Sequence, residues 1–103
     1  MALIHVVDDD ADHLAALCDL LQARGYAVAG FASAESAYAC AATPDLVLSD
    51  LRMPGWDGLD LLGHLRARHP DLAVVLLTGH GDVPQAVRAM RLGAEDFLEK
   101  PYD

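Results

Sequence analysis

Acidic, hydroxyl and basic side chains follow four strand-like stretches of this 103-residue chain. Three consecutive acids, Asp8–Asp10, come directly after LIHVV, and Asp50 follows LVLS. Thr78 follows AVVLL, and Lys100 follows EDFLE. Two carboxylates about 4 Å apart repel each other by roughly 4 kcal/mol at an effective dielectric near 20. A cluster of these acids therefore needs a cation or hydrogen-bond donors to compensate the repulsion.

These stretches and one further stretch are typical of strands, and they alternate with stretches that are typical of helices. Strands are predicted over 3–7, 26–31, 46–49, 73–77 and 95–99. Helices are predicted from Asp10 or Asp12 to Gly25, from Ser33 to Ala42, from Leu59 to an end at His69-Pro70, and from the capping acid Asp82 to Gly93. This alternation indicates an α/β fold, with a parallel five-stranded sheet and helices on both faces.

Parallel strands place their carboxyl ends along one edge of the sheet, where ligands bind in such folds. We therefore expect Asp8, Asp9, Asp50, Thr78 and Lys100 to meet at this edge. Oxygen ligands without a thiolate or imidazole favour Mg²⁺. A carboxylate set apart from its neighbours, as Asp50 is, could attack phosphorus and form an aspartyl phosphate. A metal ion, the ammonium group and the hydroxyl group would then share the charge of the phosphoryl oxygens.

Four stretches, in this order and spacing, resemble the receiver domain of bacterial two-component response regulators: VVDDD, LVLSDLRMPGWDG, VVLLTGHGD and DFLEKPYD. The resemblance spans essentially the whole chain, so residues 1–103 are predicted to be one receiver domain. It implies a doubly wound, flavodoxin-like sheet of strand order 2-1-3-4-5. Nothing in the chain matches a helix after the fifth strand, and we expect a domain truncated before that helix.

The resemblance also assigns roles around a phosphorylation site. It implies that Asp50 accepts a phosphoryl group from the phosphohistidine of a sensor histidine kinase. It implies that Asp9 binds Mg²⁺ directly and Asp8 binds it through water, with Asp50 and the backbone carbonyl of Arg52 completing the protein ligands. The protein would be a regulatory domain that catalyses its own phosphorylation and dephosphorylation, rather than an enzyme. No other cofactor is expected.

Further positions match the residues that respond to phosphorylation in this family. Thr78 would turn toward the phosphoryl group, Lys100 would form an ion pair with it, and Phe97 would move inward as the switch aromatic. Pro101 matches a cis proline that would direct Lys100 inward. Arg52 and His80 match positions that tune the lifetime of the aspartyl phosphate.

The stretches TGHGDVPQAV and GAEDFLEKPYD are most similar to receivers of the C4-dicarboxylate and nitrogen-regulation type, which usually control sigma-54 activators. Receivers with only a helix-turn-helix output are the first alternative. A Mg²⁺-dependent phosphohydrolase of the haloacid-dehalogenase kind is another, but it would need a general acid where Arg52 stands. The last alternative is a receiver that no longer accepts phosphate and serves only as an interaction surface.

Composition restricts the possible partners and the compartment. A formal net charge of −9 argues against direct binding to nucleic acid or anionic lipid. No signal peptide or membrane span is visible. Cys18 and Cys40 are interpreted as buried free thiols, which suits the cytoplasm. The predicted partners are a sensor kinase, a linked output domain and a second copy that docks on the face of the fourth helix and fifth strand.

Several polar or aromatic residues are predicted to have structural roles only. Asp10 is expected to begin the first helix rather than to bind metal, and Trp56 to shield the site. Surface or strand-packing positions are expected for the histidines His5, His13, His64 and His69, and solvated positions for the acids Asp57, Asp60, Glu95 and Glu99.

Overall fold

Strands and helices alternate along the chain. The computed structural model describes residues 2–79 and 82–99. Within these ranges the strands are β1 (Leu3–Val7), β2 (Ala27–Phe31), β3 (Leu46–Asp50), β4 (Ala73–Thr78) and β5 (Asp96–Glu99). The helices are α1 (Ala11–Ala23), α2 (Ala34–Ala39), α3 (Gly58–Arg68) and α4 (Val83–Arg91). None of these helices is long and apolar enough to cross a membrane.

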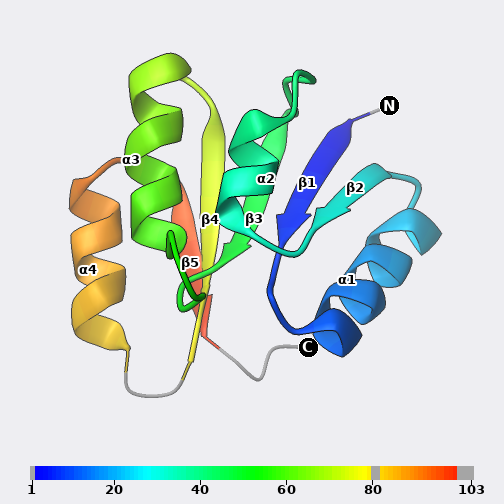
Figure 1. The fold of residues 1–103 in the computed structure, drawn as a ribbon, viewed down its shortest axis with the longest axis horizontal. Helices are drawn as coiled ribbons and strands as arrows, with labels where there is room; N and C mark the ends of the chain where they lie inside the picture. The colour runs from blue at the N-terminus through cyan, green and yellow to red at the C-terminus, as the bar shows by residue number, and fades with distance from the viewer. Residues whose placement is uncertain (1, 80–81, 100–103) are drawn as a thin grey trace.

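The strands form a single sheet of order β2-β1-β3-β4-β5, in which every neighbouring pair is parallel (Figure 1). This confirms the predicted fold class and strand order. The register aligns Asp50 with Leu77 and Thr78 with Glu99, so β3, β4 and β5 end at nearly the same level. The end of β1 lies beside β3, with Val7 opposite Ser49.

Apolar residues on the two faces of the sheet form separate cores. Alternate strand residues face opposite sides because the side-chain period of a strand is two. On one side, Val7, Val47 and Leu76 belong to a core that also contains apolar residues of α2, α3 and α4. On the other side, Val6 and Leu77 belong to a smaller core with residues of α1. Strand β1 is therefore covered on both faces, as a central parallel strand requires, whereas Val75 of β4 is only partly buried on the side of α1.

Short polar side chains begin α1 and α2 as expected. The Asp10 carboxylate accepts hydrogen bonds from the backbone N–H groups of Asp12 and His13, at 3.0 and 3.2 Å. Ser33 accepts one from the N–H of Ser36 at 3.1 Å. Helix α2 ends at Ala39 rather than continuing to residue 42, because the backbone becomes extended at the next position.

Three sequence expectations need correction. Asp57 and Asp60 are not merely solvated: they form a reciprocal capping box at the start of α3, with N–H···O distances of 2.9 and 3.0 Å. Asp82 precedes α4, but its side chain makes no capping hydrogen bond. Cys18 and Cys40 are free thiols, but both are half-buried rather than buried. Burial, with a smaller contribution from the charge of Asp19, raises the pKa of Cys18.

Candidate functional site

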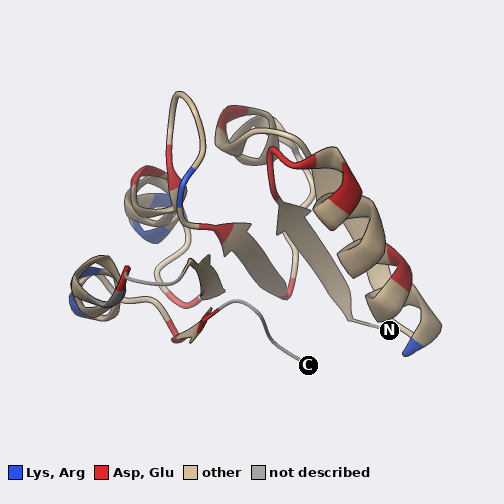
Figure 2. Cartoon of the chain, turned by 90° about the horizontal axis from the view of Figure 1, so that it is seen from below, with Lys and Arg blue, Asp and Glu red and all other residues tan. Residues whose placement is uncertain are grey.

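Three acids meet at the carboxyl edge of the sheet, as the strand pattern predicts. Asp8 and Asp9 follow β1, and Asp50 ends β3. One carboxylate oxygen from each lies within 4.8 Å of the others. Figure 2 shows this edge, with acidic segments continuing from the ends of two neighbouring strands. Asp8 is fully buried, Asp9 is exposed and Asp50 is half-buried, so the cluster reaches from the protein interior to the surface.

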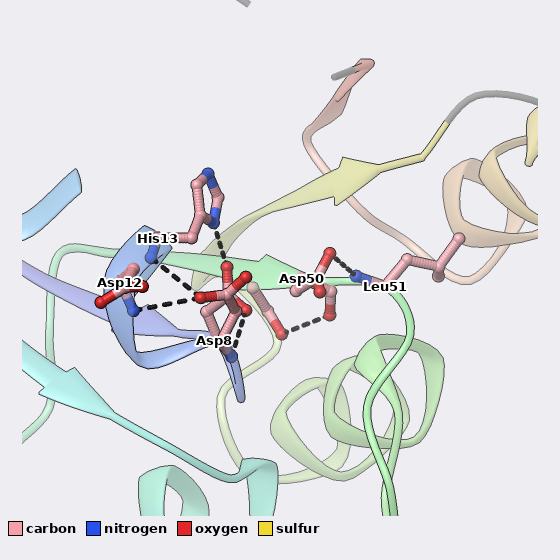
Figure 3. A network of polar contacts seen from close by, with 7 residues as sticks. Asp8, Asp12, His13, Asp50 and Leu51 are labelled. Atoms are coloured by element: carbon pink, nitrogen blue, oxygen red, sulfur yellow. Dashed lines mark hydrogen bonds and ion pairs between the residues drawn. The ribbon is translucent and has the colours of Figure 1, made fainter. Parts of the chain in front are cut away.

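Backbone and side-chain donors partly compensate the charge of this cluster. The N–H of Asp10 donates to Oδ1 of Asp8 at 3.0 Å, and the N–H of Leu51 donates to Oδ1 of Asp50 at 3.1 Å. The second oxygen of Asp8, Oδ2, contacts Nδ1 of His13 (Figure 3). The site therefore presents oriented oxygen ligands at its inner end.

His13 is the functional neighbour that sequence reasoning missed. A surface or strand-packing position was expected for it, but its side chain is 29% exposed and touches the buried Asp8. The two residues are five positions apart, which matches no metal-binding motif. The signal in the sequence was indirect: an N-cap at Asp10 begins α1 immediately after the acids, and so places the first helical turn beside them.

Thr78 lies at the end of β4 with its side chain buried. Its Oγ1 donates to the backbone carbonyl of Leu98 on β5 at 3.4 Å. Phe97, on the same strand, is half-buried and packs against the larger core. The threonine and the aromatic ring therefore lie on adjacent strands.

Arg52 joins two loops beside the acid cluster. Its Nε donates to both carboxylate oxygens of Asp82, at 2.9 and 3.1 Å, and its second guanidinium nitrogen donates to Oδ1 at 2.6 Å. This ion pair lowers the pKa of Asp82 and raises that of Arg52, in both cases chiefly through the hydrogen bonds. The carboxylate of Asp82 is thus used by Arg52 instead of capping α4.

Gly58 allows the start of α3 to approach the end of β3. Its N–H donates to the carbonyl of Leu51 at 2.8 Å. A Cβ at this position would lie 2.6 Å from the backbone oxygen of Asp50. No larger residue fits without moving the strand that carries the candidate nucleophile.

Trp56 does not lie among the acids but packs between α2 and α3. Its ring stacks on His64, with centroids 3.9 Å apart and planes 8° apart, and it meets Tyr38 edge-on at 5.5 Å. Arg68 lies over the other side of this cluster, 3.8 Å from the Tyr38 ring centroid. These contacts fix the loop between β3 and α3 on the two helices. Three residues singled out in the sequence, His80, Lys100 and Pro101, lie outside the described residues.

Comparison with known proteins identifies the family of the chain. Residues 4–103 match the family model of the response regulator receiver domain. The chain belongs to this family. Its place in two-component signalling follows from that membership, and this receiver is a regulatory domain.

The chain is similar to parts of longer transcriptional regulatory proteins. It is 50% identical to the transcriptional regulatory protein FixJ of Azorhizobium caulinodans, over 97% of the chain and 48% of FixJ. It is 46% identical to the C4-dicarboxylate transport transcriptional regulatory protein DctD of Rhizobium meliloti, over 96% of the chain and 22% of DctD. The chain therefore spans about half or less of the length of these relatives.

Solved receiver structures have the same fold. The receiver domain of NtrX from Brucella abortus superposes with a TM-score of 0.93 at 39% identity, and the match covers 97% of this chain and 87% of that one. A structure named FixJ-N gives 0.93 at 39% identity, over 100% of this chain and 84% of that chain. The predicted family and its fold are confirmed by these similarities.

Proposed function

We propose that Asp50 is the phosphoacceptor of this receiver and takes its phosphoryl group from a phosphohistidine of a sensor kinase. The observation that carries the proposal is the meeting of Asp8, Asp9 and Asp50 within 4.8 Å at the carboxyl ends of β1 and β3. An oxygen of Asp50 attacks phosphorus, the P–O bond forms as the P–N bond breaks, and the imidazole leaves with the electron pair. Positioning and charge compensation are the main contributions a protein makes to such a transfer.

The acids suit Mg²⁺, which prefers oxygen ligands and keeps several of its waters. In our proposal Asp9 and Asp50 bind the ion directly, Asp8 binds it through water, and the carbonyl of Arg52 completes the protein ligands. When bound, the ion would neutralise charge on the carboxylate and phosphoryl oxygens. The difference in burial between Asp8 and Asp9 supports these separate roles. The Asp8 carboxylate is buried and already has two protein contacts, whereas Asp9 is exposed.

Thr78, Phe97 and Lys100 are proposed to read the phosphorylated state. The bond from Thr78 Oγ1 to Leu98 is long, at 3.4 Å, so a phosphoryl oxygen on Asp50 is a competitive acceptor. Loss of the bond between Thr78 and Leu98 would loosen the attachment of β5 to β4, and Phe97 on β5 would then rearrange. Lys100 is proposed to form an ion pair with the phosphoryl group.

Arg52 and His80 are proposed to tune the lifetime of the phosphoryl group. Arg52 follows Asp50 by two residues and already binds Asp82 at the start of α4. A dianionic phosphoryl group nearby would compete for this guanidinium, which binds phosphate as readily as carboxylate. We therefore expect the segment from residue 80 to residue 97 to change most on phosphorylation.

The partners follow from the proposed chemistry and from the relatives. We propose a linked output domain that regulates transcription, of the sigma-54 activator type first and of the helix-turn-helix type second. The length and sequence of the complete protein distinguish the two. A second copy is proposed to dock on α4 and β5, where Val87 and Met90 of α4 are each more than two-fifths exposed (44% and 42%). The cytoplasm is the proposed location.

Acetyl phosphate with MgCl₂ tests the central proposal, with intact mass spectrometry as the readout. We expect one added phosphoryl group on the wild-type chain and none on Asp50→Asn. The matched control is Asp19→Asn, which removes one exposed acid on α1 and should leave the adduct unchanged. EDTA should abolish the adduct. A folded wild-type chain that gains no phosphoryl group would refute the proposal and favour the interaction-only receiver.

A further inference from the structure

The contact between His13 and Asp8 gives α1 a direct connection to the acid cluster. Figure 3 shows the His13 ring turned toward Asp8, with Asp50 close by on β3. Nδ1 of His13 contacts Oδ2 of Asp8, whose side chain has no exposed surface. An ionised carboxylate can only accept hydrogen bonds, so Nδ1 carries the proton in this contact. His13 is therefore a donor to the most deeply buried acid of the site.

Local structure sets this geometry. Asp10 caps α1 and accepts hydrogen bonds from the N–H groups of Asp12 and His13. The same residue donates its own N–H to Oδ1 of Asp8 at 3.0 Å. Each oxygen of Asp8 thus receives one contact from the segment 10–13, and this fixes the rotation of the carboxylate. Each oxygen also keeps a second lone pair for another donor.

We infer that His13 is a positioning residue of the cation site, holding the Asp8 carboxylate in the orientation that receives a metal-bound water. The inference rests on the proposed function, because it assumes that the three acids bind a divalent cation. Donors around a metal-binding group typically change metal affinity by about 10–100-fold when they are removed. The Asp10 N–H belongs to the backbone and leaves one side of the carboxylate fixed in every variant.

Three substitutions separate the donor from the bulk of the side chain. In His13→Asn the amide nitrogen lies near the place of Nδ1 and keeps a donor there. In His13→Gln the amide reaches the more distant place of Nε2, and His13→Leu keeps volume but removes all donors. The control is Asp12→Asn, which changes the charge of an exposed neighbour on the same helical turn. Circular dichroism first establishes that each variant is folded.

Isothermal titration calorimetry with MgCl₂ measures the consequence. We expect the dissociation constant to rise at least tenfold in His13→Leu and His13→Gln, and to stay within threefold of wild type in His13→Asn and Asp12→Asn. Unchanged or tighter Mg²⁺ binding by His13→Leu would overturn the inference. Equal weakening in His13→Asn and His13→Leu would also overturn it, since a structural role of the ring would be sufficient. If His13→Leu does not fold, His13→Gln against His13→Asn decides the same question.

Phosphorylation at saturating MgCl₂ keeps the two proposals distinguishable. His13→Leu should still gain one phosphoryl group from acetyl phosphate when Mg²⁺ is in large excess. If it does so with wild-type Mg²⁺ affinity, the role of His13 is refuted and the phosphoacceptor proposal stands. If the wild-type chain binds Mg²⁺ but gains no phosphoryl group, the phosphoacceptor proposal fails while the calorimetric comparison still tests His13.

Discussion

Replacing Gly58 by alanine should destabilise the fold at the point where the candidate nucleophile is held. An ideal Cβ on Gly58 lies 2.6 Å from the backbone oxygen of Asp50, 3.0 Å from Cα of Leu51 and 3.2 Å from a methyl group of Leu76. Relaxed carbon contacts lie near 3.5–4.0 Å, so the strand end or the helix start must shift by roughly 0.5–1 Å. The nearest atoms are backbone atoms, which cannot rotate away as a side chain can.

The expected magnitude follows from two opposing effects. Overpacking a buried position costs about 1–3 kcal/mol. Alanine is favoured over glycine by about 1 kcal/mol inside a helix, but Gly58 is the first residue of α3 and gains less. Its φ is not positive, so space rather than backbone conformation sets the result. We expect the free energy of unfolding of Gly58→Ala to fall by about 1–3 kcal/mol.

The same helix supplies a matched control. A Cβ on Gly63 would meet nothing within 4 Å, so Gly63→Ala should raise the free energy of unfolding by about 0.5–1 kcal/mol. Urea unfolding followed by circular dichroism measures both variants. A Gly58→Ala chain as stable as wild type, or two variants that shift in the same direction by the same amount, would refute the packing argument. Gly58→Ala should also accept phosphate more slowly, because the displaced atom belongs to Asp50.

Two further predictions concern a buried histidine and the Arg52–Asp82 ion pair. Burial lowers the pKa of His5 below its ordinary value of 6.5. Above pH 6.5 the imidazole is therefore neutral in both the folded and the unfolded protein, whereas below it the unfolded protein binds the proton first. When urea unfolding is measured from pH 7.5 down to pH 5.5, the wild type should therefore lose free energy of unfolding relative to His5→Leu. The loss should be up to about 1.4 kcal/mol per pH unit between the pKa values of the unfolded and folded states. A difference between the two proteins that does not change with pH would contradict this effect of His5. Arg52→Ala should speed amide hydrogen exchange in the first turn of α4. The backbone at Asp82 is not in the extended conformation of an N-cap, so the released carboxylate is not placed to cap the helix in place of the lost ion pair. Arg88→Ala, which removes an exposed arginine bonded to Gln85, should not change this exchange, and equal exchange in the two variants would show that the ion pair does not hold the helix start.

The acid cluster was predictable because it depends on topology. Parallel strands bring their carboxyl ends to one edge, so the positions of Asp8, Asp9 and Asp50 in the chain were sufficient to bring them together. The order of the strands was predictable only through the resemblance to receivers. Strand ends differed by one residue, as at Tyr26 and Asp50, because hydrogen-bond register rather than side-chain pattern decides where a strand stops.

The contacts that were missed depend on competition between donors and acceptors. Asp82 has the residue type and position of an N-cap, but Arg52, thirty residues earlier, offers its carboxylate charged donors instead of backbone N–H groups. The capping box of Asp57 and Asp60 uses two aspartates, whereas the usual sequence signature has serine or threonine followed by glutamate or glutamine. His13 reaches Asp8 through a helical turn whose start was left open between Asp10 and Asp12.

Helices α1 and α4 are held at their starts in different ways, and this predicts the direction in which a signal travels. The start of α1 is fixed by local bonds, since Asp10 caps it and also donates to Asp8. The start of α4 depends on a charged contact from another loop, the one between Arg52 and Asp82. New negative charge on Asp50 can compete for a guanidinium group, but it cannot compete for the N–H groups that Asp10 already caps. We therefore expect phosphorylation to release α4 and leave α1 in place.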